Sequence, residues 1–210
     1  MEVTAVEAQV SPTKGNLLAI KKSLELAKLG FDLLDRKRNI LIRETVSYVS
    51  KAQNIEKDVY DKYKEAYSAM RLANMQLGLC DNIAKTCPKD RGIDIEYHSI
   101  MGVDIPVLHY KKLPPKNSYG YYDTTLDLDK ALILFNEAKY LTYELSEIEN
   151  SVFRLSEGIR TTQKRANALK NIIIPRMTEQ IKFITAALEE KEREEFTRLK
   201  VIKNQLEEKR

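Results

Sequence analysis

The fold is decided by residues 131–173, which read ALILFNEAKYLTYELSEIENSVFRLSEGIRTTQKRANALKNII. Apolar or small residues recur here at alternating steps of three and four, with one polar member. This spacing is the heptad seam of a helix that packs against another helix. The seam positions are Ala131, Leu134, Ala138, Leu141, Leu145, Ile148, Val152, Leu155, Ile159, Thr162, Ala166, Leu169 and Ile173.

A looser pattern continues this seam to Leu206, which predicts a C-terminal long helix over residues 128–210. A second seam runs from Leu17 to Leu77, with Leu41 and the polar Arg38 among its members. It shifts phase at Val59, where a four-residue stutter locally unwinds a left-handed supercoil. It predicts an N-terminal long helix over residues 13–80, after a disordered or extended N terminus over residues 1–12. The apolar stripes of two such helices are buried most simply against each other, in an antiparallel coiled coil.

Residues 81–127 separate the two helices and change the period from three-four to two. Alternating apolar residues on both sides of a Gly-containing turn predict a β-hairpin, followed by a loop rich in Pro and Tyr. This hairpin either caps the end of the coil or binds a partner. Its candidate residues are Ile93, Ile95, Tyr97, Met101, Gly102, Val103, Ile105 and Val107. The expected fold is therefore all-α dominated, with a long antiparallel two-helix coiled coil and a short β-hairpin and loop.

The composition argues against an enzyme built on a compact fold of many elements. The 210 residues include no Trp, only 7 Gly and 6 Pro, and 31% are charged. Phosphate-binding loops, dinucleotide fingerprints, zinc-protease motifs and nucleophile elbows are all missing from the sequence. With two Cys and two His there is also no zinc pattern. From these absences together we expect no catalytic residue, no cofactor and no metal. The longest aliphatic run, Ile172–Ile174, favours a cytoplasmic protein without membrane insertion.

Basic residues are concentrated in the two ends of the chain. Residues 14–43 hold eight basic and three acidic side chains, residues 160–210 hold thirteen and eight, and the middle is mildly acidic. Antiparallel pairing brings both basic stretches to one tip, with about ten residues of the C-terminal helix overhanging. Because these bases alternate with acids and lack interleaved aromatic residues, nucleic-acid binding is not expected.

Pro175 lies inside the C-terminal periodic stretch, and the pairing places it almost opposite Gly30. A proline in a helix interior removes a backbone hydrogen bond and costs about 3 kcal/mol, usually with a kink. We expect the coil to bend at these two residues.

The ends of the chain carry a family resemblance. Residues 12–21, PTKGNLLAIK, and the segments 165–169, RANAL, and 174–176, IPR, resemble the terminal signatures of the D subunit of V-type and A-type rotary ATPases. The resemblance implies a non-catalytic rotor axle of the central stalk, transmitting rotation between the hexamer of catalytic A and nucleotide-binding B subunits and the membrane ion-translocating ring. It also implies contacts with the small F subunit of the stalk and with a socket subunit above the rotor ring.

The resemblance gives the basic tip a role, contact with acidic loops inside the hexamer. The candidates are Lys21, Lys22, Lys28, Arg36, Arg38, Arg176, Lys182, Arg193, Arg198, Lys200 and Lys203. A static coiled-coil scaffold or a membrane-surface helical protein is the alternative that long amphipathic helices also fit.

Overall fold

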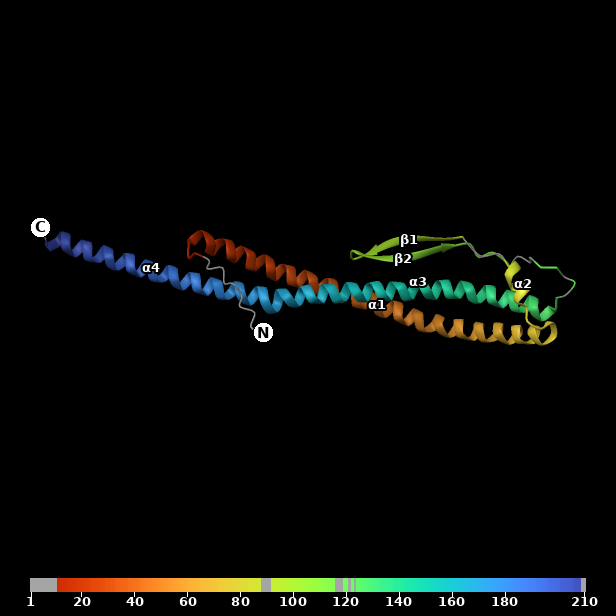
Figure 1. Cartoon of the computed structure of the whole chain (residues 1–210). Helices are drawn as coiled ribbons and strands as arrows, with labels where there is room; N and C mark the ends of the chain where they lie inside the picture. Colours follow the sequence, from red (N-terminus) through yellow and green to blue (C-terminus); the bar gives the residue numbers. More distant parts are fainter. Residues whose placement is uncertain (1–10, 88–91, 116–118, 121, 123, 209–210) are drawn as a thin grey trace. The chain divides into compact units, whose positions relative to one another are not determined.

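The computed structural model describes residues 11–87, 92–115, 119–120, 122 and 124–208. The elements in chain order are α1 (Lys14–Leu77), α2 (Asp81–Thr86), β1 (Ile93–Ile100), β2 (Val103–Tyr110), α3 (Leu126–Ala168), the π-helix η1 (Leu169–Ile173) and α4 (Ile174–Glu208) (Figure 1). The predicted fold class, two long packed helices with a short antiparallel hairpin between them in sequence, is confirmed. Residues 1–10 of the expected N-terminal segment lie outside the described residues.

The ends of α1 are set by local hydrogen bonds. At its start the Thr13 hydroxyl accepts the N–H of Asn16 at 3.2 Å, and the Asn16 amide donates to the Ser11 carbonyl at 2.9 Å. At its end Gly78 adopts a positive φ of 77°, and its N–H bonds to the Asn74 carbonyl at 3.0 Å. A left-handed glycine of this kind satisfies a terminal carbonyl and stops the helix.

The chain divides into two compact units, residues 1–38 with 161–210 and residues 39–160. In the first unit, Lys14 contacts Glu192 and Arg38 contacts Gln163, so the order of contacts is antiparallel. In the second unit, Lys62 contacts Glu137. The seam positions are the more buried ones in both units, with fully buried residues at Leu41, Ala66, Ala73, Ala131, Ala138, Leu155, Ala166 and Ile184.

A π-helical turn precedes Pro175 in the first unit. The N–H of Ile174 donates to the carbonyl of Leu169, five residues back, which is the hydrogen bond of a wide π turn. A Cβ added at Gly30 would lie 3.8 Å from Leu169 Cδ1, so Gly30 faces η1 and not Pro175. The sequence-based pairing is therefore displaced by several residues here, whereas the bend at Gly30 and Pro175 stays a prediction.

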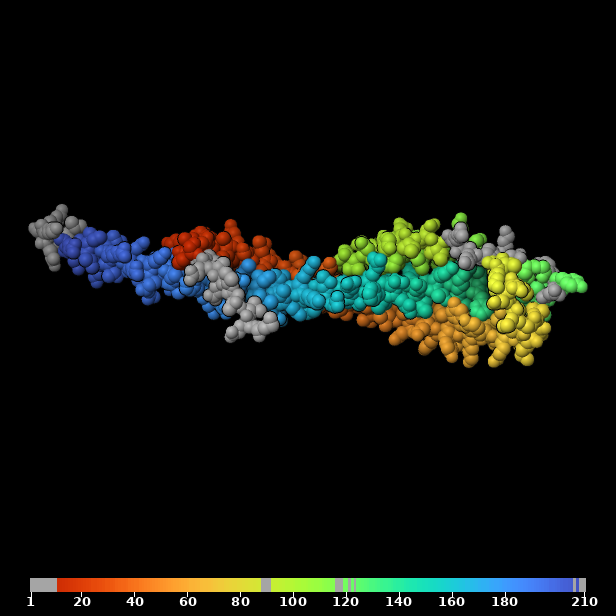
Figure 2. All heavy atoms as spheres, viewed as in Figure 1, coloured from red at the N-terminus to blue at the C-terminus, as the bar shows by residue number. Residues whose placement is uncertain are grey.

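The hairpin lies along α3 in the second unit (Figures 1 and 2). Ile100 pairs with Val103 across a two-residue turn in which Met101 and Gly102 both have positive φ, 52° and 72°. Such turns match the right-handed twist of the strands. Ile105 is buried with Leu41 and Leu155, so the hairpin shares a core with the helix pair.

Candidate functional site

The helix ends pack together in the first unit. The Lys14 ammonium lies 2.9 Å from the Glu192 carboxylate, and this hydrogen bond raises the pKa of Lys14 above its ordinary value. Leu17 and Leu188 line a groove of about 350 Å³ beside this pair, and Ile184 is fully buried nearby in sequence. The paired part of α1 and α4 therefore extends to the contact between Lys14, the first residue of α1, and Glu192 of α4.

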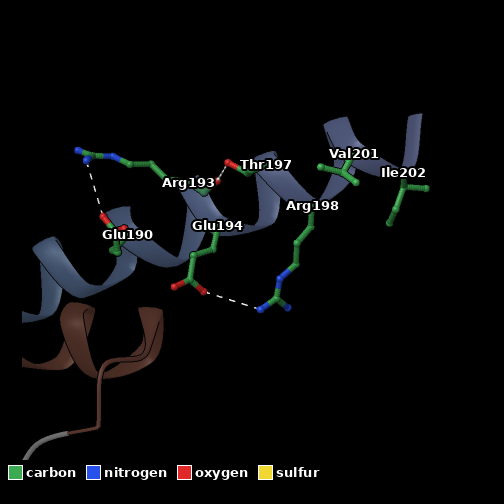
Figure 3. A pocket seen from close by; sticks show the side chains of 7 residues that line it. All are labelled: Glu190, Arg193, Glu194, Thr197, Arg198, Val201 and Ile202. Atoms are coloured by element: carbon green, nitrogen blue, oxygen red, sulfur yellow. Dashed lines mark hydrogen bonds and ion pairs between the residues drawn. The ribbon is translucent and has the colours of Figure 1, made fainter. Parts of the chain in front are cut away.

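Beyond this pair, α4 is exposed at every described side chain from residue 191 onward. Its apolar spacing continues, with Phe196 70% exposed and Leu199 and Ile202 also exposed. A hollow of about 550 Å³ lies on this segment. Figure 3 shows the side chains that line it, with Arg193 and Arg198 directed toward Glu190 and Glu194 of the same helix. We call residues 193–208 of α4 the overhang; it extends further past the pairing than the ten residues expected.

The candidate basic residues all belong to the first unit. Arg38 is half-buried, donates to Gln163 Oε1 at 2.9 Å and forms an ion pair with Asp35 at 2.7 Å. It therefore joins the two helices. The other ten are exposed, and Arg193, Arg198 and Lys203 have intrahelical glutamate partners at 3.6 to 3.9 Å.

The hairpin is held to α3 by polar contacts along β2. The Leu108 N–H donates to Glu147 Oε2 at 3.0 Å, and the Arg154 guanidinium donates to the Asp104 carbonyl at 3.3 Å. The Tyr110 hydroxyl donates to Glu144 Oε1 at 3.0 Å. Three side chains of one helix thus satisfy groups along one strand.

An aromatic cluster lies beneath the open end of the hairpin. The ring of Tyr110 stacks on Tyr140 at 5.6 Å and meets Tyr143 edge-on at 5.4 Å. Burial, reinforced by the bond to Glu144, raises the pKa of Tyr110 to about 12. The hydroxyl of Tyr140 accepts the Leu113 N–H at 2.8 Å, which ties the segment after β2 to the same helix.

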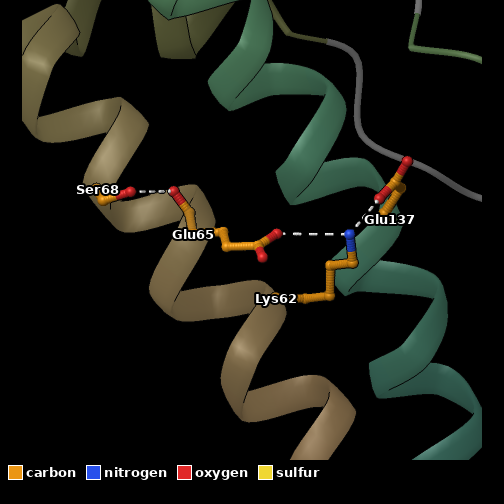
Figure 4. A network of polar contacts seen from close by, with 4 residues as sticks. All are labelled: Lys62, Glu65, Ser68 and Glu137. Carbon is orange, nitrogen blue, oxygen red and sulfur yellow. Dashed lines mark hydrogen bonds and ion pairs between the residues drawn. The ribbon is translucent and has the colours of Figure 1, made fainter.

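The helices α1 and α3 also meet through a small charge network in the second unit (Figure 4). The Lys62 ammonium lies 3.2 Å from Glu137 on α3 and 3.5 Å from Glu65 on its own helix. The hydrogen bond to Glu137, followed by the charges of both glutamates, raises the pKa of Lys62. Tyr63 and Thr142 hydroxyls hydrogen bond at 3.1 Å beside it.

The sequence of the chain matches one family over most of its length. The family model for the D subunit of ATP synthase matches residues 16–204. The chain belongs to this family. It is 39% identical over 199 residues to the D subunit of the V-type ATP synthase of Thermotoga neapolitana, covering 94% of this chain and 98% of that protein. It is 37% identical over 204 residues to the D subunit of the A-type ATP synthase of Pyrococcus furiosus, covering 95% of each.

Several residues that shape this member of the D-subunit family were missed by sequence reasoning. They are Glu144 and Glu147, three residues apart on α3, with Tyr140, Arg154 and Gly158. Glu144 and Glu147 lie outside the seam of their helix, on a side that the hairpin contacts. That position is the signal by which they could have been found. Both faces of such a helix must be occupied.

The cysteines and histidines are also candidates, by residue type, for reactive groups or metal ligands. Cys80 is buried, Cys87 is half-buried, and His109 pairs with Glu96 at 2.9 Å. Within the described residues, no three His, Cys, Asp or Glu side chains form a group that could hold a metal ion. None of the described helices has the length and apolar character needed to cross a bilayer. Tyr119 donates to Asp129 at 2.6 Å, and Tyr122 is exposed.

Proposed function

We propose that this chain is the central-stalk rotor axle of a V/A-type ATPase. It transmits rotation between the hexamer of A and B subunits and the membrane ion-translocating ring, and it is not itself catalytic. The observation that carries the proposal is the first unit, where the paired ends of α1 and α4 continue into a single exposed helix with apolar and basic side chains. The names of the relatives support membership of an ATP synthase complex.

The geometry of the helices fits the mechanical task. Stiffness comes from a continuous seam whose residues, as far as Leu188, are buried or half-buried in each unit. Asymmetry comes from α4 outlasting α1, from the π turn η1 beside Pro175, and from a hairpin on one face of α3. An asymmetric shaft presents a different face to each catalytic interface of a surrounding hexamer, so rotation changes each interface in turn.

Each surface has one proposed partner. The terminal tip with its ten exposed basic residues enters the cavity of the hexamer of A and B subunits. The middle of the chain binds the small F subunit of the stalk, and the hairpin end faces the socket subunit above the rotor ring. Single exposed ion pairs are weak, so the basic residues act together. Their summed interaction energy with the hexamer varies with the angle of rotation. The protein is then a cytoplasmic component, peripheral to the membrane.

Reconstitution tests the proposal directly. The chain is mixed with A, B and F subunits, separated by size exclusion, and the assembled peak is assayed for ATP hydrolysis. We expect one copy per hexamer and altered turnover. Phe196→Ser, on the overhang, should weaken binding to the A and B hexamer, whereas the similarly exposed Phe153→Ser, in the second unit, should not. Elution of the chain alone with unchanged turnover would favour the scaffold alternative.

A further inference from the structure

The two outer edges of the hairpin differ in their contacts with the rest of the second unit. The outer edge of β2 is covered, because α3 side chains bond the Leu108 N–H and the Asp104 carbonyl. Between them lies Pro106, which is buried and has no N–H to satisfy. The hairpin thus protects this edge by two of the usual means, a covering element and a proline.

The contacts of β2 also fix which groups of β1 point outward. Residues of an antiparallel pair alternate between hydrogen-bonded and non-hydrogen-bonded positions, and both members of a pair share the state. Leu108 turns its N–H away from β1, so its partner Ile95 turns its own N–H and carbonyl outward as well. The same alternation applies to Ile93, Tyr97 and Ser99.

This outer edge of β1 is open among the residues that the structure describes. Among the described residues, none outside the hairpin forms a backbone bond with it. Ile95 and Tyr97 are 58% and 56% exposed, and Arg154 lies over the Tyr97 ring at 5.1 Å, which fixes its orientation. The strand reads IDIEYHSI, without the lysine or proline that commonly blocks an exposed edge.

Charge selects among the possible occupants of this edge. Asp94 and Glu96 are the acidic residues of β1, Glu96 contacts His109 of β2 at 2.9 Å, and residues 93–110 contain no Lys or Arg. A second copy of the same strand would bring two more carboxylates beside these two, and like charges on neighbouring strands are unfavourable. An extended segment that carries Lys or Arg between apolar residues complements both the carboxylates and the exposed Ile95 and Tyr97.

We propose that the open edge of β1 accepts such a basic, extended segment of another protein as a third strand of the sheet. Main-chain hydrogen bonds supply the binding, and the alternate side chains supply specificity, as in other cases of strand addition. This inference rests on the proposed function, because it takes the segment to belong to a subunit of the same rotary complex.

Amide hydrogen exchange in the free chain and in the complex with A, B, F and socket subunits tests the proposal. We expect exchange at Ile95, Tyr97 and Ser99 to slow by roughly tenfold or more on assembly. The Leu108 amide, already bonded to Glu147, should change little. A photoreactive residue in place of Ile95 should crosslink to a segment with alternating Lys or Arg.

Two variants of Tyr97 distinguish a role of its backbone N–H from a role of its side chain. Tyr97→Pro removes one outward N–H, at a position directly opposite the natural Pro106, and should abolish the protection of Ile95 and Ser99. Tyr97→Thr keeps the N–H, so Ile95 and Ser99 should remain protected in that variant. Two outcomes would overturn this inference and leave the proposed function standing. One is a complex that assembles while the β1 amides exchange as in the free chain. The other is a dimer of this chain that Tyr97→Pro abolishes. Failure of the complex to assemble would overturn the proposed function and the assigned partner together.

Discussion

Gly158 of α3 lies directly beneath Val103 of β2. A Cβ added at position 158 would stand 2.7 Å from Val103 Cγ2 and 3.9 Å from Leu41 Cδ1. Real Cβ atoms do not approach so closely, and the stiff valine side chain has few ways to withdraw. The glycine is therefore what allows the hairpin to reach the core of Leu41, Ile105 and Leu155.

Gly158→Ala should destabilise the protein although alanine is the better helix former. The helix gains about 0.5–1 kcal/mol from the substitution, but overpacking against Val103 costs about 1–3 kcal/mol. We expect a net loss of about 1 kcal/mol in the free energy of unfolding, measured with urea.

Two further variants control for helix propensity and for the named contact. Gly30→Ala should stabilise, because its Cβ would lie at an ordinary 3.8 Å from Leu169. Adding Val103→Ala should remove most of the clash introduced by Gly158→Ala in a double-mutant cycle. Equal effects of alanine at positions 30 and 158 would show that the clash is absent.

Tyr110 should make the docking of the hairpin sensitive to alkaline pH. Its folded pKa, about 12, exceeds the ordinary value of 10.0, because burial and the carboxylates of Glu144 and Glu147 disfavour the phenolate. A group with a raised folded pKa contributes stability that is present below pH 10 and is lost between about pH 10 and 12. Tyr110→Phe should flatten the dependence of unfolding free energy on pH in this range.

A spectrophotometric titration of the tyrosines checks the assignment. Tyr110→Phe should delete the step near pH 12, while Tyr60→Phe, which changes an exposed ring, should leave that step in place. Persistence of the same step in Tyr110→Phe would assign it to another residue.

The seam could be predicted from sequence because burial along a helix follows a fixed geometric period. Leu41, Ala138 and Leu155 lie on the predicted seam and are fully buried. The hairpin was predictable for the same reason, since its period of two and its Gly turn are local properties. These signals require no knowledge of what lies on the other side of each element.

Contacts that depend on how elements meet could not be predicted. The need for glycine at 158 arises from Val103, which is distant in sequence. Arg38 is a predicted partner contact, but it donates to Gln163 because a seam position forces its side chain between the helices. The π turn was also missed, because proline signals the loss of a backbone bond and not which wider turn accommodates it.

The overhang should be the least protected helical segment of the first unit in the free protein. Its described side chains from residue 193 onward are exposed, so tertiary packing does not stabilise it. Amide exchange should be fast from Phe196 to Ile202 and markedly slower around the buried Ile184. Strong protection throughout the overhang in the isolated chain would contradict this expectation.

Neutralising basic residues of the tip together should weaken assembly with the A and B hexamer. Lys21, Lys22, Lys28 and Arg36 are exposed on α1 in the first unit, and their replacement by Gln removes charge without removing a buried contact. Because surface charges act mainly through long-range attraction, we expect roughly tenfold weaker binding at low salt and a smaller difference at high salt.

The matched control removes the same number of charges from another part of the same helix. Lys51, Lys57, Lys64 and Arg71 are exposed on α1 in the second unit, and their replacement by Gln should leave hexamer binding nearly unchanged. Binding constants of both variants are measured over a series of salt concentrations. Equal losses in the two variants would indicate a nonspecific effect of net charge, and a tip variant with an unchanged constant at every salt concentration would mean that the tip is not recognised through charge.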